Sequence, residues 1–179
     1  SFFVTIYTLY LYTRTRQIFQ HIALFYSTIF FLGSVGNIIF PNIEPWAGGL
    51  FLISIGLIWG LYTFNEVLGP SWLGYFLSTS TTSIGSIILI DNLLINNDLL
   101  QIIFLILGSV LFVWASIQLT EQVIFYIGGL GLVVNLPRLI TELLPDNIWP
   151  PLILFLVGGV LVSVGLYLNS IRENIKNND

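Results

Sequence analysis

Seven apolar runs, separated by short polar or proline-containing breaks, account for most of this 179-residue chain. Most of the runs are near or above the roughly 18 residues that indicate a membrane-spanning helix. Charged residues make up only 8% of the sequence, whereas an ordinary soluble domain carries roughly 25%. The sequence therefore predicts an all-α protein, a polytopic transmembrane helical bundle in contact with a lipid bilayer.

The composition also argues against several classes of function. Lys and Arg together number only five, the net charge is −4 and nothing forms a basic patch, so we expect no nucleic-acid partner. Because cysteine is absent, disulfides, thiol catalysis and cysteine-ligated metals are excluded. No nucleophile–base pair or metal-binding group stands out, so we expect no enzyme activity, no cofactor and no metal.

The runs place seven predicted spans at 1–12, 18–40, 46–64, 71–90, 99–119, 123–136 and 150–168. The Gly69-Pro70 pair is a strong breaker between two of them, and Thr120-Glu121-Gln122 resembles a helix start. The first run would rise only about 18 Å as a helix, against a hydrocarbon core of about 30 Å. We therefore expect a truncated first helix, with more chain ahead of Ser1.

A repeat of about fifty residues is visible in the aromatic pairs at 25–26, 75–76 and 125–126, which begin alternate spans. Such internal repetition dictates architecture and predicts tandem helical hairpins. The alternative is a chance alignment of apolar helices rich in Phe, Leu and Gly. The predicted units are a truncated first helix with a basic turn at 1–17, then hairpin repeats at 18–70, 71–122 and 123–179, the last including a polar tail.

With two spans in each repeat, all hairpin turns of one kind lie on the same side of the membrane. One side then carries four of the five basic residues, namely Arg14, Arg16, Arg172 and Lys176. The positive-inside rule makes that side cytoplasmic, or stromal in an organelle. We expect a bacterial inner membrane or an organelle membrane. The opposite side carries Arg138 and the acidic residues Glu44, Asp91, Asp98, Glu142 and Asp146.

The fourth span is the most polar stretch inside any predicted helix, with a run of serine and threonine from 78 to 83. Hydroxyl groups in a membrane helix can bond to the carbonyl one turn earlier, and small residues let helices approach closely. Helix packing is therefore the simpler interpretation. The alternative is a polar pathway for a small solute, with Ser78, Thr81, Thr82 and Ser86 as its candidate residues.

His21 is the only histidine and lies near the predicted cytoplasmic start of the second span. A single histidine cannot supply two axial haem ligands or build a metal site without nearby carboxylates. Packing at the membrane interface, or a hydrogen bond to a lipid headgroup, is the simpler interpretation. A role in proton relay is the alternative.

Arg138 and Glu142 are spaced i, i+4 after Pro137, which predicts a short interfacial helix on which they could pair. A surface ion pair of this kind contributes a few tenths of a kcal/mol. The alternative is contact with a lipid headgroup or another anion. The glycine pairs at 48–49, 128–129 and 158–159 are interpreted as helix-packing surfaces, since no lysine follows them as in a phosphate loop.

The hairpins, the turn PDNIWPP at 145–151 and the closing GLYLNSIREN at 165–174 resemble the C-terminal spans of uncharacterised multi-pass bacterial membrane proteins. The resemblance covers about the last fifty residues. It implies transmembrane helices and carries no assigned activity. The tail here holds only two basic residues, Arg172 and Lys176, fewer than such tails commonly have.

These observations lead to two hypotheses of different classes. The first is a non-catalytic scaffold or accessory subunit of a larger membrane assembly, with other membrane subunits as partners. It rests on spans without charged residues in their interiors. The second is a small-solute transporter or lipid-handling protein that uses the polar fourth span, for which a polar cavity near the midplane would be expected. An enzyme ranks third, because its chemistry would have to sit in the turns.

Overall fold

Over the residues that the structure describes, six α-helices follow one another in chain order: α1 (Phe2–Thr15), α2 (Ile18–Ile39), α3 (Pro45–Phe64), α4 (Ser71–Leu93), α5 (Asp98–Leu119) and α6 (Gln122–Leu143). The computed structural model describes residues 2–15, 17–39, 41, 42, 44–94 and 97–143, with 155, 158, 159, 162 and 163. Five helices, α2 to α6, are long and apolar enough to cross a membrane. The prediction of an all-α, multi-pass helical protein is confirmed.

Most helix boundaries lie within a few residues of the predicted ones, with two corrections. α4 continues to Leu93, where the Asn92 side chain donates to the Ile88 carbonyl. α6 continues through Pro137 to Leu143, so the predicted end at 136 and the separate interfacial helix are wrong. A proline removes one helical hydrogen bond, but ending a helix in apolar surroundings would leave several backbone groups unpaired. Almost all of the seventh predicted span lies outside the described residues.

Thr120 does not cap α6 as the sequence suggested. α6 does begin at Gln122, but Thr120 ends α5 in the left-handed conformation, with φ of 53°. Its backbone N–H donates to the Ser116 carbonyl, and its hydroxyl donates to the Leu119 carbonyl. The residue therefore closes the preceding helix, a place more often taken by glycine or asparagine.

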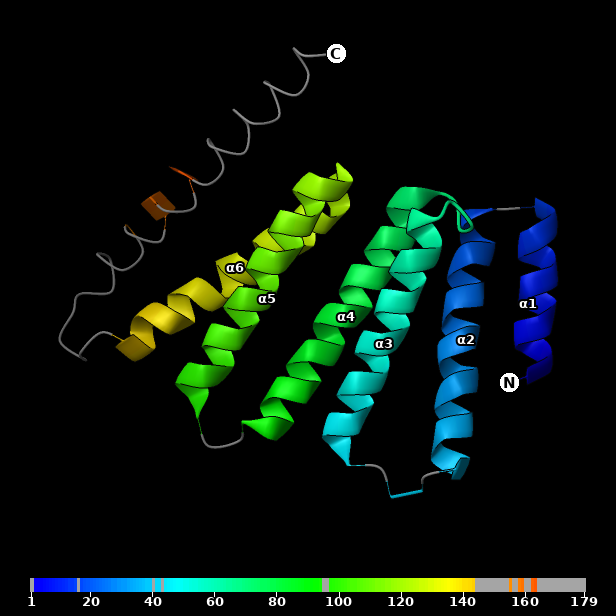
Figure 1. Ribbon diagram of the computed structural model, residues 1–179, viewed down its shortest axis with the longest axis horizontal. Helices are drawn as coiled ribbons and strands as arrows, with labels where there is room; N and C mark the ends of the chain where they lie inside the picture. The colour runs from blue at the N-terminus through cyan, green and yellow to red at the C-terminus, as the bar shows by residue number, and fades with distance from the viewer. Residues whose placement is uncertain are drawn as a thin grey trace, which may run out of the picture.

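The helices follow one another in an open row and alternate in direction (Figure 1). The most extensive contacts lie within the pairs α1–α2, α3–α4 and α5–α6. α4 contacts α3, α5, α6 and, more narrowly, α2. Half of its span is buried, compared with 11% of the span of α2. α4 is therefore the centre of the packing, and the row is held together across it.

The three close pairs each join the second helix of one predicted hairpin to the first helix of the next. A fifty-residue period accommodates either grouping, so the hairpin boundaries stay a prediction. The aromatic pairs behave alike in one respect. The second ring of each is exposed, namely Tyr26, Phe76 and Tyr126, whereas the first is buried or half-buried.

The α3–α4 pair is joined by direct contact between backbones. A methyl group built on Gly85 would lie 2.7 Å from the Gly49 carbonyl oxygen and 2.8 Å from the Ile53 amide nitrogen. A methyl group on Gly56 would lie 2.8 Å from the Ser78 carbonyl oxygen. Real Cβ atoms do not approach this closely, so only glycine fits at these positions. Small residues thus allow the close approach that helix association in a membrane requires.

One member of each described glycine pair at 48–49 and 128–129 makes such a contact. Gly49 packs against α4 and Gly128 packs against the Ser109 carbonyl of α5, whereas Gly48 and Gly129 face open space. Gly158 and Gly159 also have nothing nearby. The interpretation of the pairs as packing surfaces is therefore confirmed for Gly49 and Gly128, whereas the other four glycines make no such contact with the described residues.

We predict that Gly49→Ala lowers the free energy of unfolding by about 1–3 kcal/mol, the usual cost of overpacking. The added methyl group would meet the Leu89 amide nitrogen at 2.6 Å and the Gly85 carbonyl at 2.7 Å, and backbone atoms cannot move aside cheaply. Equilibrium unfolding in mixed detergent micelles measures the change.

Gly48→Ala is the matched control, because it lies on the same helix and its methyl group would meet nothing within 4 Å. Alanine is a better helix former than glycine by up to about 1 kcal/mol, so this variant should be as stable as the parent or more so. Equal destabilisation by both variants would contradict the close α3–α4 contact.

Candidate functional site

His21 is completely buried, with 0% of its side chain exposed. This burial fits the expected packing role, whereas a hydrogen bond to a lipid headgroup is contradicted because both ring nitrogens have partners within the protein. Trp59 of α3 and Gly69 in the turn between α3 and α4 hydrogen-bond to its ring, and Tyr12 of α1 packs its ring against that of His21. We call these four residues the His21 cluster.

The hydrogen bonds of His21 determine which ring nitrogen carries the proton. The indole Nε1 of Trp59 lies 3.1 Å from His21 Nε2, and an indole N–H can only donate. Nε2 is therefore the acceptor and carries no hydrogen. In the neutral ring the hydrogen is then on Nδ1, which lies 3.2 Å from the Gly69 carbonyl oxygen and donates to it.

Tyr12 binds the same glycine from the other side. The Gly69 amide donates to the Tyr12 hydroxyl at 2.7 Å, and this hydroxyl donates to the Gly69 carbonyl at 3.1 Å. Both backbone groups of Gly69 are thus satisfied by side chains from α1 and α2. The turn after α3 is fixed to the first two helices by these bonds.

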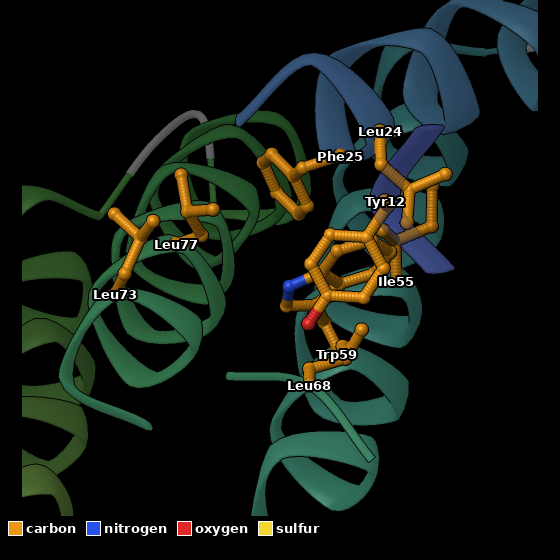
Figure 2. Close-up of a cluster of buried hydrophobic side chains, with 8 residues drawn as sticks. All are labelled: Tyr12, Leu24, Phe25, Ile55, Trp59, Leu68, Leu73 and Leu77. Carbon is orange, nitrogen blue, oxygen red and sulfur yellow. The ribbon is translucent and has the colours of Figure 1, made fainter. Parts of the chain in front are cut away.

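Aromatic and aliphatic side chains seal the cluster. The His21 ring centroid lies 5.4 Å from that of Tyr12 and 5.7 Å from that of Trp59, and Phe25 meets Trp59 edge to face at 4.9 Å. Figure 2 shows side chains of α1, α2, α3, α4 and the α3–α4 turn gathered here. Throughout the described ranges, no buried side-chain nitrogen or oxygen lacks a hydrogen-bond partner. The surroundings of His21 are apolar apart from its bonded partners.

The hydroxyl groups of α4 mostly bond to backbone carbonyls. Ser78 donates across the helix pair to the Gly56 carbonyl at 2.7 Å. Thr82 and Ser86 donate one turn back within α4, to Ser78 and Thr82, at 2.9 and 2.8 Å. Thr81 is also buried. This use of three of the four candidate hydroxyls favours helix packing over a pathway.

Arg138 and Glu142 lie on the last turns of α6, where both side chains are exposed. The Arg138 carbonyl accepts a hydrogen bond from the Thr141 hydroxyl. Over residues 97–143, which the structure describes, no ion pair joins the two side chains. Their contact with a headgroup or anion stays a prediction, as do the roles of Arg16, Arg172 and Lys176, which lie outside the described residues.

Sequence reasoning missed Tyr12, Trp59 and Gly69. A tryptophan inside a span needs a partner for its N–H, and Trp59 is such a residue. Trp114 of α5 also lies inside a span but is 60% exposed, so this signal does not by itself identify the cluster. The partners of His21 lie 38 and 48 residues along the chain, beyond the range of local patterns.

Within the described ranges, no group of three or more His, Cys, Asp or Glu residues could hold a metal ion. Comparison of the chain with protein-family models, with curated proteins and with solved structures finds no significant match.

We predict that Tyr12→Phe lowers the free energy of unfolding by about 1–3 kcal/mol. The substitution leaves the ring in place but removes the hydroxyl that accepts from the Gly69 amide, and an unpaired buried donor costs about this much. Chemical denaturation in detergent measures the loss.

Tyr10→Phe serves as the control on the same helix. The Tyr10 side chain is 54% exposed, and Phe would keep the ring over which the Arg14 guanidinium lies. Its stability should match that of the parent. A loss in Tyr12→Phe no larger than that in Tyr10→Phe would contradict the hydrogen bonds assigned to Gly69.

Proposed function

We propose that this chain is a non-catalytic integral membrane subunit that acts as a scaffold or accessory component of a larger membrane assembly. Five apolar helices of spanning length fit an integral membrane protein. The observation that carries the proposal of a scaffold or accessory role is the hydrogen bonding of the α4 hydroxyls. Ser78, Thr82 and Ser86 each donate to a backbone carbonyl, so they contribute to helix packing and offer no free donors along a path.

The open row of helices gives a second support. Only 17% of the span is buried in α5 and in α6, and 11% in α2. Large apolar side chains on these helices, such as Phe30, Leu111 and Leu130, are more than 60% exposed. In a bilayer, lipid or neighbouring helices cover such faces. A subunit arranged in this way can pack against other membrane proteins along both sides of the row.

A transporter or lipid handler is the second candidate, and two observations favour it. Buried hydroxyl residues gather on α4, at Ser78, Thr79, Thr81 and Thr82. An open hollow of about 650 Å³ beside the α1–α2 turn is lined by Gln17, Ile18, Phe19, Gly69 and Pro70. Its largely apolar wall suits an acyl chain better than a charged solute.

We predict that the chain, extracted from its native membrane in mild detergent, purifies with other membrane proteins in fixed stoichiometry. Native mass measurement of the particle, compared with 20.1 kDa for this polypeptide, tests the prediction. A particle that contains only this chain and lipid would contradict the subunit proposal and favour the second candidate.

The double variant Thr81→Val Thr82→Val separates the candidates further. If α4 lines a pathway, proteoliposomes that contain the parent protein swell in isosmotic glycerol or urea. The double variant then abolishes this swelling while the amount of folded protein is unchanged. Under the subunit proposal, the parent protein causes no swelling above that of empty liposomes. Thr28→Val, on α2 with its hydroxyl bonded to the Leu24 carbonyl, is a control for loss of a threonine hydroxyl elsewhere.

A further inference from the structure

The His21 cluster joins two parts of the molecule that otherwise share few contacts. Beyond their mutual contacts, the α1–α2 pair meets the other helices where α2 touches α4 and where Tyr12, Leu24 and Phe25 enter the core formed with α3 and α4. Three further side chains of α2 pack partly buried against this core: Ile22, Ile29 and Leu32. The Tyr12–Gly69, His21–Gly69 and His21–Trp59 bonds cross this boundary. Loss of any one of these hydrogen bonds therefore weakens an interface that has few other contacts.

The hydrogen-bond pattern at His21 fits only the neutral ring. Nε2 faces the Trp59 N–H, a donor with no acceptor capacity. A second proton on the ring would go to Nε2 and set two N–H groups against each other at the present separation of 3.1 Å. The protonated ring would then also carry a positive charge in an apolar enclosure, which is costly without a paired anion.

In the part of the chain that the structure describes, no carboxylate is placed to compensate that charge. On α1 the nearest titratable group is the Tyr12 hydroxyl, which is bonded to Gly69, and Arg14 is exposed. α3 carries no charged residue, Glu66 in the α3–α4 turn is exposed, and Asp91 of α4 lies at the opposite end of that helix. Among the described residues, no carboxylate forms an ion pair with His21.

We propose that His21 is a proton-operated latch: uptake of a proton on Nε2 breaks the hydrogen bond from Trp59 and releases the α1–α2 pair from the α3–α4 pair. The closed form keeps the neutral ring. The open form lets water reach the ring and accepts the proton. Acidification therefore shifts the population toward the open form, and the latch is closed at neutral and alkaline pH. The inference holds whichever of the two proposed functions is correct.

One bound proton sets the size of the effect. When opening is linked to uptake of a single proton, the ratio of open to closed molecules rises at most tenfold for each unit by which the pH falls. Because a hydrated imidazole takes up its proton near pH 6.5, the ratio stays constant well above this pH and rises as the pH falls below it.

The test uses the intact chain in lipid nanodiscs and two measurements. Because the chain has one histidine, ¹⁵N-histidine labelling gives a single pair of ring signals, expected to show hydrogen on Nδ1 alone at pH 8 and on both nitrogens at pH 5. Because the chain has no cysteine, spin labels at Phe19→Cys and Phe64→Cys, both exposed sites on α2 and α3, report the distance between the helix pairs. A population with a longer distance between the two labels should appear as the ring becomes doubly protonated. Its ratio to the short-distance population should rise at most tenfold for each unit by which the pH falls.

His21→Gln is the matched variant, because an amide can accept from Trp59 and donate to Gly69 without titrating. It should keep the short distance from pH 8 to pH 5. Three results in the parent protein would overturn the latch. The ring could become doubly protonated with no change of distance, or it could stay neutral with the distance unchanged down to pH 5. The third result is hydrogen on Nε2 at pH 8. These outcomes are read from the parent protein, so they stand even if His21→Gln fails to fold. Opening of His21→Gln equal to that of the parent also overturns it.

Discussion

The direct backbone contact between α3 and α4 is the interaction on which the rest of the structure depends. Gly49, Gly56 and Gly85 bring the two helices so close that the Ser78 hydroxyl reaches the Gly56 carbonyl. In a membrane, helices gain little by burying apolar surface against one another, so dispersion contact and interhelical hydrogen bonds carry association. Since α4 also contacts α2, α5 and α6, the position of this pair determines where the remaining helices pack.

The same environment explains how the polar groups are used. A polar atom in the hydrocarbon region that lacks a partner costs several kcal/mol, and the hydroxyls of α4 avoid this by bonding to carbonyls of their own helix or of α3. His21 avoids it by accepting from Trp59 and donating to Gly69. The two solutions differ in one respect. A hydroxyl bonded to a carbonyl does not change between pH 5 and pH 8, whereas an imidazole does.

Much of the fold follows from the sequence, because span length and apolar composition are local properties. The described spans begin and end close to where Pro45, Gly69-Pro70 and the polar residues around Asn97 interrupt the pattern. Pro137 misled the prediction because the cost of a proline inside a helix is smaller than that of an early helix end in lipid. The candidate site was harder to predict from the sequence. The chain pattern marks His21 as unusual, but its partners come from α1, α3 and a turn, and only the packed structure brings them together.

Hydropathy also fails to distinguish the face of a helix that meets lipid from the face that meets another helix, because both are apolar. Gly48 and Gly49 are neighbours of the same type, yet one is open and the other touches the backbone of Leu89. The buried face of α4 is recognisable by small and hydroxyl residues at helical spacing, at Gly74, Ser78, Thr82 and Gly85. α2 has no such stripe along most of its length and is the least buried span. The α1–α2 pair is therefore joined to the α3–α4 pair by few contacts, those of His21 and its neighbours among them, and a single proton there acts on the weakest junction in the row.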